Sequence, residues 1–312
     1  MSPEAPGRVV VLLATWNAAR FVEEQVDSVL AQQGVQVRLV VSDDASDDGT
    51  PAILARLAAR HPGRVKLLPA APRRFGNANR HFLRLIADAD VADGEHVAFC
   101  DHDDVWLPWK LERAVQVIRA DALHAFSSDV TAFWPDGRER LVRKSGAQRA
   151  HDHLFESAGP GCTFVLAPAA FAEVRAWLDS HREAARDAKV HDWLIYAYAR
   201  THGWRWRIDD RPSMRYRQHA ANEVGANSGW AALKARWRNV ASGAYRHDVL
   251  TIARLIGDRS WVTQALARLR PLDRLRLAVS VRQLRRSGRD QLALALFVLV
   301  MPGGERASGA GR

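Results

Sequence analysis

The stretch Val97-Ala-Phe-Cys-Asp101-His102-Asp103-Asp104-Val-Trp106-Leu-Pro108 joins four strand-forming residues directly to three carboxylates. A buried strand that ends this way aims several oxygen atoms at the carboxyl edge of a sheet, where open α/β sheets bind ligands. Oxygen ligands suit a hard cation such as Mg²⁺ or Mn²⁺, which would hold a phosphate-bearing substrate. The alternative is a helix start before Pro108, which would explain Asp104 alone. Three carboxylates within four residues repel one another, and this favours a cation.

The composition predicts a globular protein with one large domain and an extension, since the chain has 312 residues and 47% hydrophobic content. Its two cysteines, Cys100 and Cys162, lie in apolar runs and are expected to be free buried thiols of a reducing compartment. Residues 1–7 are polar and lack the pattern of a secretory signal. The longest apolar run, residues 292–301, is too short to span a membrane, so we expect a cytoplasmic protein.

The positive charge is confined to the C-terminal part of the chain. Residues 1–230 carry 29 Lys and Arg against 30 Asp and Glu, whereas residues 231–312 carry 16 against 5. A basic segment favours an anionic surface, either a membrane or a nucleic acid. Because the first part is nearly neutral, a nucleic-acid partner is not expected, and peripheral contact with the inner face of the cell membrane is the preferred hypothesis.

Strand-like and helix-like segments alternate through the first 120 residues. The continuous apolar runs are expected to be strands buried on both faces, and the segments between them have helical spacing. Strands are expected at 9–14, 37–42, 65–68 and 97–100, with helices at 21–30, around 53–57, at 81–89 and after Pro108. This alternation predicts a doubly wound α/β fold, with a mostly parallel sheet flanked by helices.

The alternation is lost after residue 120. Strands are expected at 125–134, 138–143, 162–166, 204–208 and 213–217, helices from about 169 and at 191–201, and an irregular segment at 218–225. From about 230 the pattern is wholly helical, and the last ten residues are expected to be disordered.

Polar residues at the expected strand ends are candidates for ligand binding. Ser46, Asp47 or Asp48 would cap the next helix, which would leave Asp43 and Asp44 free to accept hydrogen bonds from a base or a ribose. Trp16 would stack on a base or, as a single aromatic residue, belong to the core. Asp192 is a candidate general base or a helix cap, and His219 a metal or phosphate ligand or a structural residue.

Several other site types have no motif in the sequence. There is no G-x-G-x-x-G after the first strand and no G-x-x-x-x-G-K-[ST], which argues against dinucleotide and P-loop sites. There is also no G-x-S-x-G and no Cys/His spacing typical of zinc.

Taken together, these features resemble the family-two glycosyltransferases of the GT-A fold over about residues 8–225. The matching segments are Ala14-Thr15-Trp16-Asn17, residues 25–33, Ser42-Asp43-Asp44-x-Ser46-x-Asp48-x-Thr50, Cys100-Asp101-His102-Asp103-Asp104-Val-Trp106, Gly161-Cys162-Thr163-Phe164, His191-Asp192-Trp193 and Tyr216-Arg217-Gln218-His219. The Asp-x-Asp-Asp-x-Trp, His-Asp-Trp and Tyr-Arg-Gln-His set is most similar to the bacterial rhamnosyltransferase-like branch. The order and spacing of these segments are specific, although no single one is.

The resemblance implies inverting transfer of a sugar from a nucleoside-diphosphate donor to a glycan or lipid-linked acceptor, in synthesis of cell-envelope polysaccharide. Residues 1–107 would form the nucleotide-binding half, residues 108–225 the acceptor half and residues 226–302 a basic helical extension before the tail at 303–312. The implied donor-binding residues are Ala14, Thr15, Trp16, Asn17, Asp43, Asp44, Asp101 and His102. Asp101, Asp103 and His219 would hold Mg²⁺ or Mn²⁺ with the diphosphate, and Asp192 would be the base.

Two positions depart from the common family pattern. His102 stands where Gln is common in this branch, which leaves the metal ligands intact. His191-Asp192 replaces the Glu-Asp of many other members, which leaves the acceptor open. The weaker alternatives are a haloacid-dehalogenase-like phosphatase, in which an Asp-x-Asp motif follows the first strand, and a non-catalytic basic membrane-binding module.

Overall fold

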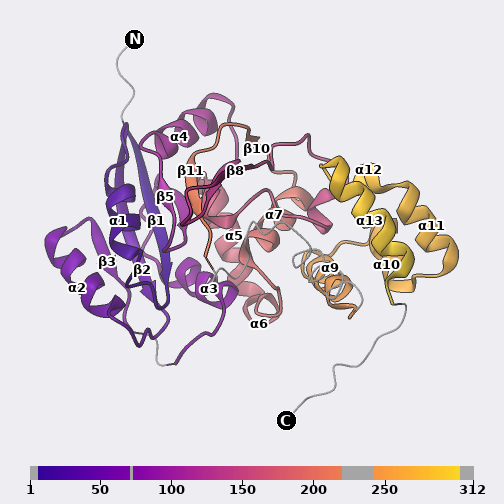
Figure 1. The fold of residues 1–312 in the computed structure, drawn as a ribbon, viewed down its shortest axis with the longest axis horizontal. Helices are drawn as coiled ribbons and strands as arrows, with labels where there is room; N and C mark the ends of the chain where they lie inside the picture. Colours follow the sequence, from indigo (N-terminus) through magenta and orange to yellow (C-terminus); the bar gives the residue numbers. More distant parts are fainter. Residues whose placement is uncertain (1–5, 71–72, 220–241, 303–312) are drawn as a thin grey trace.

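The computed structural model describes residues 6–70, 73–219 and 242–302 of the chain. Figure 1 shows the strands gathered in one part of the molecule, and the C-terminal helices grouped at the end away from the first strands. The predictions for residues 220–241 and for a disordered tail at 303–312 lie outside the described residues. In the part that is described, no helix is both long enough and apolar enough to cross a membrane.

The main sheet has seven strands in the order β10-β6-β9-β4-β1-β2-β3. Their bounds are β1 Gly7–Thr15, β2 Val35–Asp43, β3 Val65–Leu67, β4 His96–Cys100, β6 Ala125–Ser128, β9 Val165–Leu166 and β10 Trp206–Asp209. β1 pairs in parallel with β2 and β4, and β9 is antiparallel to β4 and β6. The predicted mostly parallel α/β fold is therefore confirmed.

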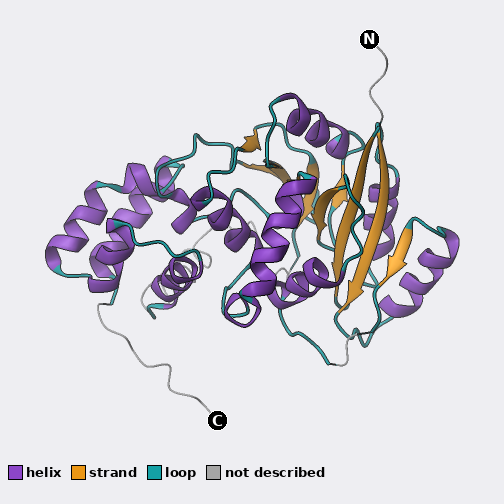
Figure 2. Cartoon of the chain, turned by 180° about the vertical axis from the view of Figure 1, so that it is seen from behind, coloured by secondary structure: helices purple, strands orange, loops and turns teal. Residues whose placement is uncertain are grey.

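Helices cover both faces of this sheet (Figure 2). Their bounds are α1 Val22–Leu30, α2 Thr50–Arg60, α3 Ala78–Asp88, α4 Lys110–Ala120, α5 Pro168–Ser180, α6 Arg182–Ala185 and α7 His191–Thr201. Alternate residues of β1 belong to two different hydrophobic clusters, with Val10 and Leu12 in one and Val11 and Leu13 in the other. Successive side chains of a strand point to opposite faces, so a continuous apolar run is what a sheet covered on both sides requires.

A second, four-stranded sheet has the order β5-β11-β7-β8. Its strands are β5 Val105–Trp106, β7 Val130–Phe133, β8 Glu139–Val142 and β11 Met214–Arg217. The prediction of one strand over residues 125–134 is wrong, because β6 and β7 belong to different sheets. Asp129 lies between them, fully buried, and its carboxylate accepts hydrogen bonds from the backbone N–H groups of Lys144 and Ser145 and from the Ser145 hydroxyl. This buried cap fixes the point where the chain leaves the main sheet.

The C-terminal helices share the hydrophobic core of the α/β part. They are α9 Ala244–Leu255, α10 Trp261–Arg268, α11 Pro271–Val279, α12 Val281–Leu284 and α13 Gly288–Val300, which confirms the predicted helical character in this region. Leu284, Leu294 and Val298 belong to the same cluster as Val10 and Leu12 of β1. These helices are therefore packed against the α/β part of the molecule.

A buried ion-pair network ties the C-terminal helices to α7. Arg286 donates to Asp152 at 2.9 Å and lies 3.4 Å from a Glu156 oxygen, and all three side chains are almost fully buried. Asp152 also accepts hydrogen bonds from Arg200, at 2.6 Å, and from the Tyr196 hydroxyl, at 3.1 Å, both on α7. Loss of one partner from such a network leaves uncompensated charge in the interior.

We expect Arg286→Met to lower the free energy of unfolding by about 3–5 kcal/mol, because Asp152 and Glu156 would lose a buried cation. Urea denaturation followed by circular dichroism measures this loss. The matched control is Arg56→Met, since Arg56 pairs with Glu23 at 3.0 Å on the open surface. That change should cost about 1 kcal/mol or less. Equal losses in the two variants would show that the buried network does not stabilise the fold.

Candidate functional site

The site lies where β1, β2 and β4 end side by side. In the parallel register Thr15 is opposite Asp43, and Leu13 is opposite Cys100, the residue before Asp101. Chain segments that are far apart in sequence therefore meet at one edge of the sheet, as expected for a ligand site in an open α/β fold.

Hydrogen bonds join the loop after β1 to the loop after β2. Asn17, at a positive φ of 46°, donates its backbone N–H to the Ser46 hydroxyl at 2.9 Å. Its side-chain amide donates to Asp47 at 2.7 Å and accepts the Asp47 backbone N–H at 3.1 Å. Asn17 thus holds the loop after β1 against the loop after β2. The contact of Asn17 with the donor remains a prediction.

Asp43 and Asp44 both have partners within the protein. Asp43 accepts hydrogen bonds from the Thr15 hydroxyl and from the backbone and side chain of Ser46, at 2.7–2.8 Å. Asp44 is buried and accepts the backbone N–H groups of Phe75, at 2.5 Å, and Gly76, at 3.0 Å. Both carboxylates therefore hold neighbouring loops, and their predicted contact with the donor remains a prediction. Carboxylate oxygens have further lone pairs, so a ligand contact is still open to them.

Trp16 stands at the mouth of the site with 41% of its surface exposed, and is not a core residue. The guanidinium of Arg74 lies 3.8 Å from the centre of its ring, and 3.9 Å from an Asp44 oxygen. Arg74 therefore occupies one face of the ring on which a base was expected to stack. Sequence reasoning gave Arg74 no role, and its only signal was its place in a loop rich in Gly, Asn and Arg.

Asp103 and His219 meet although 116 residues separate them. His219 Nε2 lies 2.8 Å from Asp103 Oδ2, and its ring stacks on Phe21 with centroids 5.2 Å apart. Arg217 donates its Nε–H to the Asp103 carbonyl at 2.7 Å and its backbone N–H to Asp104 at 3.1 Å. Sequence reasoning quoted Arg217 without a role. Here it joins β11 to the carboxylate loop.

The carboxylates of Asp101 and Asp104 lie near the thiol of Cys162. Ligand atoms of Asp101, Asp104 and Cys162 lie within 4.8 Å of one another. Burial, reinforced by the charges of Asp103 and Asp101, raises the pKa of Asp104 well above its usual range. Burial likewise raises the pKa of the Cys162 thiol. Asp104 is almost fully buried and accepts the Arg217 backbone N–H at 3.1 Å, so it also holds the carboxylate loop against β11.

His102 and the first residues of the site are largely covered. Ala14 and Thr15 are buried at the end of β1. Burial lowers the pKa of His102, whose ring hydrogen-bonds the backbone of Ala14. His102 therefore links β1 to the carboxylate loop.

Asp192 is the first-turn carboxylate of α7. Removal from water raises its pKa to about 6, although the backbone N–H groups of Trp193 and Gly161 and the nearby charge of Lys144 act in the opposite direction. Trp193 donates its N–H to Oδ1 at 2.5 Å. A carboxyl group with a pKa near neutrality suits a general base.

Gly161 packs directly against this residue and its neighbour. A Cβ at position 161 would lie 2.8 Å from His191 Nε2 and 3.1 Å from Asp192 Cβ. His191 is buried and stacks on Phe82 with centroids 3.9 Å apart, and burial lowers its pKa to about 3. Neutral His191 and Gly161 thus set the position of Asp192. The motif containing Gly161 was noted in the sequence, but this close approach was not.

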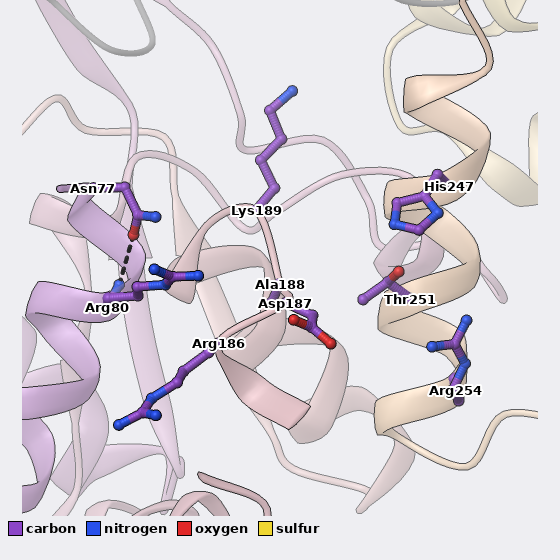
Figure 3. Close-up of a pocket in the computed structure, with 9 residues that line it drawn as sticks. All are labelled: Asn77, Arg80, Arg186, Asp187, Ala188, Lys189, His247, Thr251 and Arg254. Atoms are coloured by element: carbon purple, nitrogen blue, oxygen red, sulfur yellow. Dashed lines mark hydrogen bonds between the residues drawn. The ribbon is translucent and has the colours of Figure 1, made fainter. Parts of the chain in front are cut away.

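A hollow of about 440 Å³ lies between α3 and α9 (Figure 3). One of its lining residues, Lys189, is three residues before Asp192 in the sequence. Four of its nine lining residues are Lys or Arg, and they come from the start of α3, the segment 186–189 and α9: Asn77, Arg80, Arg186, Asp187, Ala188, Lys189, His247, Thr251 and Arg254. Arg80 on one side faces His247 and Thr251 on the other. Arg186 pairs with Glu183 and Lys189 with Asp248.

Comparisons with known proteins agree with this geometry. The sequence profile of "Glycosyl transferase family 2" matches residues 10–188. The dTDP-rhamnosyl transferase RfbG of Shigella flexneri is 35% identical over 288 residues, which cover 92% of this chain and 99% of that protein. The succinoglycan biosynthesis protein ExoO of Rhizobium meliloti is 34% identical over 128 residues, which cover 40% of this chain and 34% of that protein.

Among solved structures, S. aureus TarS 1-349 in complex with UDP-GlcNAc superposes with a TM-score of 0.58 at 17% identity. The superposition covers 95% of this chain and 82% of that one, and at this identity it shows the fold alone. The profile match and the long RfbG match establish that the chain belongs to glycosyltransferase family 2, with the GT-A fold.

Proposed function

We propose that the protein transfers rhamnose from dTDP-rhamnose to a hydroxyl group of a glycan or lipid-linked acceptor, in synthesis of a cell-envelope polysaccharide. The observation that carries this proposal is the 35% identity to a dTDP-rhamnosyl transferase over 99% of that protein's length. The phosphatase alternative loses support, because the Asp-x-Asp motif follows β4 and not the first strand.

The donor would bind at the carboxyl edge of β1, β2 and β4. Ala14, Thr15, Trp16 and Asn17 would line the base, with Asp43, Asp44, Asp101 and His102 around the ribose and diphosphate. Exposure of the Trp16 ring supports base stacking, provided that Arg74 moves off the ring. The displaced guanidinium would remain beside the donor, where its positive charge can meet a phosphate.

Asp103 and His219 fit a divalent cation. Asp101, whose ligand atoms group with those of Asp104 and Cys162 in this structure, is the third proposed ligand. Ligands of an octahedral ion at about 2.1 Å lie about 3 Å from one another, close to the 2.8 Å between Asp103 Oδ2 and His219 Nε2. When bound, Mg²⁺ or Mn²⁺ would neutralise negative charge on the departing diphosphate. Oxygen and imidazole donors suit Mn²⁺. Arg217 would keep Asp103 in place by its hydrogen bond to the backbone carbonyl of Asp103.

Asp192 would act as the base in a single displacement. The acceptor oxygen forms a bond to the anomeric carbon as the bond from that carbon to the diphosphate oxygen breaks, and dTDP leaves with the electron pair. The hydroxyl proton passes to Asp192. One displacement inverts the anomeric configuration and requires no covalent nucleophile on the protein.

A phosphate-bearing acceptor would suit the basic hollow. Arg80 and Arg254 have no carboxylate partner among the described residues, so both guanidinium groups are available to an anion. The segment 186–189 joins this hollow directly to α7 and its Asp192. We propose that residues 1–225 carry the reaction and that the extension after 226 supports acceptor binding.

The donor proposal is tested by thermal shift with dTDP-rhamnose, UDP-GlcNAc and GDP-mannose, each with and without Mn²⁺. We expect dTDP-rhamnose with Mn²⁺ to give the largest rise in Tm, because binding to the folded state stabilises it. Asp103→Ala should lose most of the metal-dependent part of that rise. A larger shift with UDP-GlcNAc or GDP-mannose would contradict the donor. Unchanged metal dependence in Asp103→Ala would contradict the metal site.

Asp192 is tested by the pH dependence of dTDP release from dTDP-rhamnose, with an extract of lipid-linked glycans as acceptor. We expect kcat/KM to rise with pH and to level off above about pH 6, because only ionised Asp192 accepts the proton. Asp192→Asn should lower kcat by about a thousandfold or more and leave Mn²⁺-dependent dTDP binding intact. Activity near the wild-type level in this variant would remove Asp192 as the base.

Gly161→Ala should lower kcat by about tenfold to a hundredfold, because the added methyl group meets His191 and Asp192 and displaces the base. dTDP affinity, measured by calorimetry, should change little. The matched control is Gly288→Ala, where the added Cβ meets nothing within 4 Å. If Gly161→Ala kept full activity, the close packing would have no part in positioning Asp192.

A further inference from the structure

Two neighbouring C-terminal helices carry an unusual share of exposed apolar side chains. Among the described residues, ten large hydrophobic side chains are exposed, and seven of them are on α11 and α13. They are Leu272, Leu275 and Val279 of α11 and Leu292, Leu296, Leu299 and Val300 of α13, each with 50–79% of its surface exposed. We call these seven residues the apolar face. Soluble surfaces rarely gather apolar groups in this way without a partner.

The apolar face follows helical periodicity. Leu272, Leu275 and Val279 are spaced i, i+3, i+7, and Leu292, Leu296 and Leu299 are spaced i, i+4, i+7, so each set forms one stripe. The opposite sides of the same helices carry Leu277, Leu294 and Val298, which are buried in the core. Each helix is therefore apolar on both its inner and its outer side.

The two helices are joined to each other. Arg274 of α11 donates to the carbonyl groups of Val298 and Leu299 at the end of α13, at 2.7 and 3.2 Å. Figure 1 shows α11 and α13 side by side at the end of the molecule away from β1–β3. The stripes thus belong to one rigid pair of helices.

Positive charge accompanies the apolar face. Arg282 and Arg289 are exposed in or beside these helices, with no carboxylate partner among the described residues. The acidic residues nearby, Asp273 and Asp290, are paired with Arg268 and Arg285. Residues 231–312 as a whole carry 16 basic and 5 acidic side chains. The exposed surface there is both apolar and cationic.

We propose that the apolar face docks on an anionic lipid bilayer, with α11 and α13 lying in the plane of the headgroups. Leucine side chains would enter the acyl boundary while arginines contact lipid phosphates, as in interfacial helices. A second copy of the chain is the less favoured occupant, because two such basic surfaces would repel each other. The inference rests on this surface alone and is independent of the sugar that the enzyme transfers.

The test is flotation of the full-length protein with vesicles of phosphatidylcholine containing about one third phosphatidylglycerol. We expect the wild type to bind these vesicles, and to bind more weakly at high salt or to phosphatidylcholine alone. The variant Leu272→Ser/Leu275→Ser/Leu292→Ser/Leu296→Ser should lose affinity by about a hundredfold. Arg282→Gln/Arg289→Gln should lose roughly fivefold for each charge removed.

Matched controls separate the apolar face from general surface effects. Leu67→Ser/Leu141→Ser removes exposed leucines elsewhere, and Arg205→Gln removes an exposed arginine on the α/β part. Both should bind vesicles as the wild type does. Thermal shift with dTDP and Mn²⁺ checks that every variant is folded and keeps its nucleotide site.

Three outcomes would overturn the proposal. The wild type could fail to float with anionic vesicles, or the serine variant could float as fully as the wild type. Alternatively, analytical ultracentrifugation could show a wild-type dimer that the serine variant converts to monomer, with no vesicle binding by either. The last result would assign the apolar face to contact between copies of this chain.

Discussion

The parallel pairing of β1 with both β2 and β4 is the constraint on which the site depends. Because β1 lies between these strands in register, its last residue is opposite Asp43, and Leu13 is opposite Cys100. This edge of the site can then be assembled from three short loops, each anchored by a buried strand, and His219 and Asp192 are added from elsewhere in the chain. The same apolar runs that drive burial of the sheet also decide which polar residues meet at its edge.

Polar residues at this edge hold the loops as well as facing the site. Asn17, Asp43 and Asp44 each make two or more hydrogen bonds within the protein. Asn17 and Ala45 also have positive φ angles, which side chains other than glycine seldom adopt without such support. The loops are thus fixed before any ligand arrives, which reduces the ordering cost of binding.

Sequence reasoning predicted the parts whose signal is local. The strands β1, β2 and β4 were predicted from their strand-forming residues, and a helix was predicted at 191–201, the bounds of α7. It could not predict that Asp129 would divide residues 125–134 between two sheets, because the partners of Asp129 lie 15 and 16 residues further on. Three further contacts likewise depend on the folding of distant segments. They are the contact of Asp103 with His219, the stacking of the Arg74 guanidinium on the Trp16 ring, and the close approach of Gly161 to His191. Only the resemblance to a family pointed to the first of these.

The C-terminal helices are physically coupled to the residue proposed as the base. Asp192 opens α7, and one turn later Tyr196 donates to Asp152, which is held by Arg286 of the extension. A truncation before α9 would therefore remove a cation that Asp152 and Glu156 need in the interior. The same extension carries the apolar face, and its helices share a hydrophobic cluster with α7. Substitutions on the apolar face leave this buried network intact, so they separate membrane contact from support of the active site.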